Sequence, residues 1–288
     1  MTPPQSRPAL AAAYPALFVV LWSTGFIAAK FGLPYAPPLG FLVIRFACAT
    51  ALLSAIALLQ RAAWPHGAML AHLAVAGLLV HGVYLGGVFI ALKQGMEAGT
   101  SAMLVGLQPL LTVLLARAWL GEPVRRSQWL GLLLGVIGVY MVVRHKIAIG
   151  REGLIAALVA LAAISIGTLY QKRHCARVDI RTGAAVQFLV CAIVFAPLAL
   201  TLEREAVQFT GSFVFALGWS VVVLSVGAIS LLYWLLRHGA AANVARLFYL
   251  VPPVTALMAF ALFGERLELT ALFGMVMIAG GVALSGRR

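Results

Sequence analysis

Apolar residues occur along the chain in runs of about twenty, separated by short clusters of charged residues, Pro and Gly. A bilayer core about 30 Å thick needs roughly 20 such residues to be crossed by an α-helix. The pattern therefore predicts an all-α polytopic membrane protein with ten transmembrane helices and no separate soluble domain. The predicted ranges are 10–32, 37–59, 68–92, 98–119, 127–144, 153–172, 182–201, 212–236, 241–263 and 269–286.

The second half of the chain repeats the first. A shift of 143 residues superimposes Pro, Thr, Gly and Glu residues that compositional bias does not easily match. A weaker match, at shifts of 142 to 144, extends the repeat to the first three helices of each half. The matched pairs include Pro109 with Pro252, Thr112 with Thr255, Glu122 with Glu265, Gly131 with Gly274, Gly138 with Gly281, Ser23 with Ser165, and Arg45 with Gln187.

Each repeat contains five predicted helices, within residues 10–144 and 153–286. Because five is odd, the second repeat enters the membrane from the opposite side, which makes this an inverted-topology repeat within one integrated membrane domain. Such repeats are typical of secondary transporters, in which two inversely related halves exchange conformations around a site at the membrane midplane.

Composition agrees with the membrane assignment, with 63% apolar and only 10% charged residues and a mean hydropathy of +1.02. The net charge of +13 would favour nucleic acid as the partner of a soluble protein, but here anionic lipid is the natural partner. Twelve Lys and Arg residues fall on one side of the predicted helices and seven on the other. This bias predicts that both termini are cytoplasmic, in the inner membrane of a bacterium.

The predicted fourth and ninth helices each contain proline and are each followed by a glutamate at the end. Pro109, Pro252 and Pro253 are expected to bend these helices and to free carbonyl groups toward a cavity, unless the bends serve packing alone. Glu122 and Glu265 close the same helices in Gly-Glu turns. We expect them to act as helix-end locks, that is, as caps or ion pairs to neighbouring helices, rather than as substrate ligands.

Ionisable residues within predicted helices are the stronger candidates for a substrate site, because charge within a bilayer is costly. Arg45 and Arg246 lie inside the second and ninth helices, although either side chain would also be explained by snorkelling to the interface. His81, with Tyr84 one turn later, lies near the centre of the third helix; a hydrogen-bonded interior histidine is the alternative. Further candidates for the cavity wall are Trp22, Ser23, Gln108, Gln187 and Tyr249.

No acidic residue falls in the middle of a predicted helix. A buried carboxylate is the usual means of binding a cationic drug or relaying protons, so a neutral or carboxylate-bearing solute is favoured. The sequence lacks a phosphate-binding loop and a nucleophile–base pair, and its three cysteines form no metal-binding spacing. We therefore expect no enzymatic activity, no cofactor and no metal site.

The duplicated unit, with its Pro, LGE-type turn and Gly-spaced last helix, resembles the EamA domains of the drug/metabolite transporter superfamily. The WSTGFIAAK stretch at 22–30 is similar to the first-helix pattern of that family, and within it the chain is most like the YddG-type amino-acid exporters. The resemblance implies a ten-helix exporter with a central cavity flanked by the fourth and ninth helices. The small multidrug relatives have a membrane glutamate in the first helix, and its absence here argues against their cation antiport.

The sequence thus predicts a secondary transporter, acting as a monomer, that exports amino acids or related metabolites by alternating access. Two alternatives are a broad exporter of drugs or toxic metabolites and, from another class, a channel-like pore.

Overall fold

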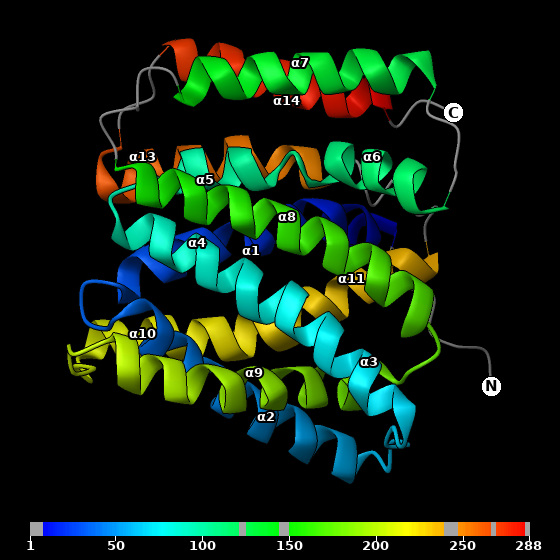
Figure 1. Cartoon of the computed structure of the whole chain (residues 1–288), viewed down its shortest axis with the longest axis vertical. Helices are drawn as coiled ribbons and strands as arrows, with labels where there is room; N and C mark the ends of the chain where they lie inside the picture. Colours follow the sequence, from blue (N-terminus) through cyan, green and yellow to red (C-terminus); the bar gives the residue numbers. More distant parts are fainter. Residues whose placement is uncertain (1–7, 121–124, 144–149, 239–246, 266–268, 286–288) are drawn as a thin grey trace.

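The computed structural model describes residues 8–120, 125–143, 150–238, 247–265 and 269–285 (Figure 1). In the first half the elements are α1 (Pro8–Gly32), α2 (Pro38–Leu59), α3 (Ala68–Gly77), η1 (Leu78–Val83), α4 (Tyr84–Lys93), α5 (Ala98–Val105), α6 (Gln108–Leu120) and α7 (Arg126–Val143). In the second half they are α8 (Arg151–His174), α9 (Ile180–Leu202), α10 (Gly211–Gly218), η2 (Trp219–Ala228), α11 (Ile229–His238), η3 (Phe248–Leu250), α13 (Val251–Phe263) and α14 (Leu269–Ser285). Among the described residues, all regular structure is helical.

Seven of the described helical stretches are long and apolar enough to cross a membrane, and shorter apolar helices cover 248–263 and 272–281. Two of the seven are continuous through a π-helical segment, because η1 joins α3 to α4 and η2 joins α10 to α11. The chain is therefore a helical, multi-pass membrane protein.

Prolines mark where two of the predicted helices change course. The predicted fourth helix is divided, since α5 ends at Val105 and α6 begins at Gln108. Pro109 lies in the first turn of α6, and Pro252 and Pro253 lie in the first turn of α13 after the short η3. The first turn tolerates proline because its N–H groups have no partner within the helix.

Helices of the two halves pack in matched pairs. Equivalent helices pack directly against each other in the pairs α2 with α9 and α7 with α14, whereas α13, the equivalent of α6, packs on α5. Contacts between non-equivalent helices also come in matched sets, since α1 packs on α10, η2 and α11 while α8 packs on α3, η1 and α4. The pair α7–α14 lies at one edge of the structure and α2–α9 at the opposite edge (Figure 1).

Glycines set the close approach of α7 to α14. A β-carbon on Gly281 would lie 2.4 Å from the carbonyl oxygen of Gly131, and one on Gly138 would lie 2.7 Å from that of Gly274. Gly131 and Gly274 are equivalent positions, as are Gly138 and Gly281, so exchange of the two halves converts one contact into the other. The order of these contacts makes α7 and α14 antiparallel, and small residues are what permits backbones to approach this closely.

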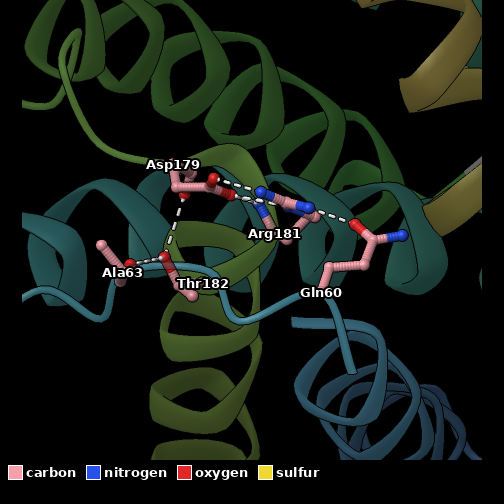
Figure 2. Close-up of polar contacts among 5 residues, drawn as sticks. All are labelled: Gln60, Ala63, Asp179, Arg181 and Thr182. Atoms are coloured by element: carbon pink, nitrogen blue, oxygen red, sulfur yellow. Dashed lines mark hydrogen bonds and ion pairs between the residues drawn. The ribbon is translucent and has the colours of Figure 1, made fainter. Parts of the chain in front are cut away.

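Polar contacts tie the α2–α9 pair at both ends. Figure 2 shows one end, where Arg181 bonds to the carboxylate of Asp179 through Nη2 (2.6 Å) and Nε (3.0 Å) and donates to Gln60 Oε1. Thr182 Oγ1 donates to the carbonyl of Ala63 at 2.9 Å. The bond from Arg181 holds the pKa of Asp179 below its usual range, so the carboxylate stays charged and keeps Arg181 in place well below neutral pH.

At the other end of the pair the Glu203 carboxylate accepts from the amides of Leu39 and Gly40, both at 2.8 Å. These amides belong to the first turn of α2, which has no intrahelical acceptors for them. The two ties therefore occupy equivalent ends of α2 and α9 while using different chemistry.

Replacing Gly281 by Val should destabilise the protein, because the new side chain meets the backbone of α7. Overpacking of this kind costs about 1–3 kcal/mol, which we expect as a fall of several degrees in Tm measured in detergent. Gly280→Val is the matched control, because a β-carbon at Gly280 meets nothing within 4 Å. Equal Tm values for the two variants would contradict the packing described.

Candidate functional site

A cavity of about 600 Å³ lies between the two halves of the structure. In the first half its walls come from α1, α2, η1, α4, α5, Gly106 and α6, and in the second half from α8, α9, η2, α11, η3 and α13. Equivalent positions face it from both halves, including Trp22 with Ile164, Phe26 with Thr168, and Pro109 with Pro252. The cavity is thus built jointly by the two repeats.

Two π-helical segments at equivalent positions shape the cavity. η1 carries His81 to the wall and η2 carries Leu224 and Ser225. Widened turns of this kind are rare and occur frequently at functional sites. Sequence patterning did not predict them, because a single widened turn leaves the apolar run unchanged.

Glycines turn the third transmembrane helix so that His81 faces the cavity. Gly77 packs on the backbone of Gln187 in α9, and Gly82 and Gly86 pack on the Phe195 ring. Gly87 approaches α8, where its β-carbon would lie 2.4 Å from the carbonyl oxygen of Ala156. Since these small residues occupy the faces toward α8 and α9, the larger side chains point into the cavity.

Arg45 supplies the fixed charge of the site. Its side chain lines the cavity although the residue is only 7% exposed, so it does not reach the molecular surface. Among the described residues the guanidinium Nε has no hydrogen-bond partner, and Arg45 lies within electrostatic range of both His81 and Tyr84, which line the same cavity. In the part of the chain that the structure describes, no carboxylate lines this cavity.

Gln187 supports the site from behind. It is 3% exposed and absent from the cavity wall, but its Oε1 lies 3.1 Å from Nε2 of His81. An amide oxygen only accepts, so this contact selects the histidine tautomer with its hydrogen on Nε2. Gln187 therefore orients His81, whose ring also packs 4.3 Å from that of Phe188.

Aromatic side chains form much of the remaining wall. Trp22 makes an edge contact with Phe248 at 5.1 Å between ring centroids and a tilted contact with Phe18 at 5.4 Å. Gln108 also lines the cavity and donates from Nε2 to Thr168 Oγ1 at 2.9 Å. Five further wall residues carry no signal that distinguishes them in the sequence: Phe26, Phe89, Thr168, Phe188 and Ser225. Two of them lie at repeat-equivalent positions, Thr168 at that of Phe26 and Phe188 at that of Phe46.

Besides Gln187, the sequence-predicted residues Ser23, Tyr249 and Pro253 lie away from the cavity wall. Ser23 is fully buried and donates to the carbonyl of Val19 at 2.7 Å and of Val251 at 3.3 Å, so it faces the packed side of α1. Tyr249 and Pro253 face a separate small void beside Met275 of α14. Arg246 lies outside the described residues.

Glu265 holds three cavity-lining helices together at one end. Its carboxylate forms an ion pair with Lys30 at the end of α1 and accepts from the amides of Ala98 (2.9 Å) and Gly99 (3.4 Å) at the start of α5. The preceding Gly264, at φ +66°, ends α13 and turns the chain toward this contact. A carboxylate at a helix N-terminus is favoured by the helix dipole.

The corresponding position in the first repeat, Glu122, lies outside the described residues, and Lys172, the equivalent of Lys30, is exposed. Glu265 itself is only 8% exposed and does not line the cavity. Its geometry is that of a contact between helix ends.

Comparison with known proteins identifies the family to which the chain belongs. The model of the EamA-like transporter family matches residues 9–144 and 151–287. The chain belongs to the EamA-like transporter family. It is therefore a transporter and not an enzyme, and it resides in a membrane.

Individual relatives are similar over nearly their whole length. The chain is 29% identical to the uncharacterized transporter YvbV of Bacillus subtilis, over 98% of this chain and 92% of YvbV. It is 26% identical to a probable amino-acid metabolite efflux pump of Salmonella typhimurium, over 93% of this chain and 92% of that protein. A crystal structure with 21% identity matches 97% of this chain and 98% of its own, with a TM-score of 0.67, and this likeness concerns the fold.

Removing the Glu265 contact should loosen the end of the helix group. In a double-mutant cycle of Lys30→Met and Glu265→Gln, we expect a coupling of about 1 kcal/mol, because Lys30 is partly exposed and solvent screens the pair. Each single variant should lower Tm, and the double variant should lower it by less than the sum. Glu205→Gln is the control, because its pair with Lys93 is at the surface and should contribute little. Additive effects of Lys30→Met and Glu265→Gln would contradict a direct interaction.

Proposed function

We propose that this protein is a secondary transporter that exports amino acids or related metabolites across the bacterial cytoplasmic membrane by alternating access. The observation that carries the proposal is one central cavity to which equivalent segments of both halves contribute. A site shared by two inversely related halves is what alternating access requires, because rearranging one half against the other transfers access from one side to the other.

The topology proposed with it comprises ten transmembrane helices in two inverted five-helix repeats, residues 10–144 and 153–286. The antiparallel glycine contacts between α7 and α14 support the inversion, since both halves contribute equivalent residues to them. With both termini cytoplasmic, the Lys30–Glu265 contact lies on the outer side. The structure then corresponds to a state in which this contact closes the helix ends on the outer side. We propose the monomer as the transporting unit.

The proposed substrate contacts are made by Arg45, His81, Tyr84, Gln108 and Trp22, which face one cavity. Gln187 acts through His81, and Pro109 and Pro252 shape the wall. The Salmonella relative named as a probable amino-acid metabolite efflux pump supports this substrate class. A cavity whose described wall contains Arg but no carboxylate disfavours the cationic drugs of the alternative exporter.

The decisive experiment is counterflow in proteoliposomes containing the purified protein. Labelled amino acids and related carboxylates should enter preloaded vesicles faster than they enter empty liposomes, and the rate should saturate with concentration. Conduction without saturation or counterflow would indicate the channel-like pore, and failure of every such solute to move would refute the proposal.

Filling the cavity should block transport without unfolding the protein. Gly25 lines the cavity, and a β-carbon there meets only Leu224 at 3.7 Å, so Gly25→Phe has room to extend inward. We expect at least a tenfold loss of counterflow rate with little change in Tm. Gly218→Phe on the exposed face of α10 meets no atom within 4 Å and should transport normally. Wild-type rates for Gly25→Phe would exclude this cavity as the transport route.

Proton coupling depends in this proposal on His81, because no carboxylate lines the described cavity and an imidazole can bind and release a proton. We expect His81→Ala to flatten the pH dependence of counterflow. His66→Ala, in the exposed connection between α2 and α3, is the control. An unchanged pH profile in His81→Ala would remove His81 from the mechanism and favour facilitated diffusion.

A further inference from the structure

We infer that the cavity binds organic anions through a carboxylate at Arg45 and disfavours solutes that also carry an ammonium group. The preferred class is then an apolar carboxylic acid whose amine is absent, oxidised or acylated, rather than the zwitterionic amino acid. The inference concerns the site of the proposed function and depends on that function only for its transport role.

The first step is the unpaired charge. An arginine guanidinium stays protonated in proteins, and Arg45, which is 7% exposed, lines the cavity while its buried Nε has no hydrogen-bond partner among the described residues. An uncompensated charge within a membrane is costly. A bound carboxylate removes that cost because it accepts two parallel hydrogen bonds from the guanidinium.

The second step is the lack of a charged acceptor for an ammonium group. The polar side chains that line the described wall beside Arg45 are neutral hydroxyl, amide and imidazole groups, namely those of Tyr84, Thr112, Thr168, Ser225, Gln108 and His81. Two of these hydroxyls already donate to a carbonyl, Ser225 Oγ to Ser220 at 3.1 Å and Thr168 Oγ1 to Ile164 at 2.6 Å. Neutral acceptors hold an ammonium less strongly than a carboxylate does.

The third step is the charge balance around a bound amino acid. Its ammonium group is attached to the carbon next to the carboxylate, so a carboxylate at Arg45 brings the ammonium close to a like charge. No carboxylate in the described wall offsets that repulsion. The amide oxygen of Gln108, whose Nε2 is bound to Thr168, is a neutral acceptor only.

The aromatic wall defines the rest of the solute. Trp22, Phe26, Phe89, Phe188 and Phe248 line the same cavity as Arg45. Such a wall favours an apolar or aromatic body attached to the carboxylate, since burial of apolar surface stabilises the complex in proportion to area.

Four ligands that share a benzyl body test the inference by calorimetric binding to the purified protein in nanodiscs. They are 3-phenylpropionate (anion), N-acetylphenylalanine (anion with a bulky neutral amide), phenylalanine (zwitterion) and phenethylamine (cation). We expect both anions to bind at least tenfold more tightly than phenylalanine, and phenethylamine to bind most weakly. The acetylated ligand separates the charge of the amine from its volume.

Arg45→Gln should reduce binding of both anions at least tenfold and remove their advantage over phenylalanine. Arg45→Lys, which keeps the charge but not the planar fork, should retain part of that advantage. Because Arg45→Gln removes an unpaired buried charge, its Tm without ligand should equal or exceed that of the wild type. If that variant does not fold, the order of the four ligands on the wild-type protein decides.

Tighter binding of phenylalanine than of 3-phenylpropionate, or an anion preference that survives Arg45→Gln, would overturn the inference. Counterflow of the same labelled ligands keeps the two proposals separate. Transport of phenylalanine without binding of the anions refutes only the inference, whereas Arg45-dependent anion binding without counterflow of any solute refutes only the proposed function.

Discussion

Equivalent helices of the two halves pack against each other in the pairs α2 with α9 and α7 with α14, and the rest of the structure depends on this constraint. Phe46 stacks on its equivalent Phe188 with 5.8 Å between ring centroids, and Gly131 and Gly138 meet Gly281 and Gly274. Without water to drive association inside a bilayer, helices are held by such close packing. Because each half presents matching surfaces to the other, the space enclosed between them is lined by both.

Within this matched frame the chemistry is unequal. Arg45, His81, Tyr84 and Gln108 face the cavity from the first half, whereas the positions equivalent to Tyr84 and Gln108 are Ala228 and Val251. Gln187, the equivalent of Arg45, lies behind the wall and binds His81. Duplication thus supplies the shape of the cavity, and divergence between the copies supplies one polar side and one largely apolar side. An anion with an apolar body matches that division.

The sequence indicated which polar residues lie within membrane helices, but not which of them face a common cavity. The cost of charge in a bilayer identified Arg45 and His81, and the structure places both on one wall. Ser23 and Tyr249 look equally suitable from their neighbours, yet they face packed helices, because a rotation of a few tens of degrees about a helix axis changes which side chain reaches the cavity. The π-helical turns of η1 and η2 cause such a rotation, and hydropathy does not register them.

The sequence by itself determined the membrane class, the helical content and the duplication, since hydrogen-bond satisfaction in lipid leaves an apolar chain no other regular structure than helices or a closed barrel. It also drew attention to Glu265, whose repeated Gly-Glu turn predicted a role at a helix end. Only the tertiary structure decided that this carboxylate contacts Lys30 and the first amides of α5, which are far from it in sequence. The same holds for the buried Nε of Arg45, since only the packing of the surrounding helices decides that no described residue bonds to it.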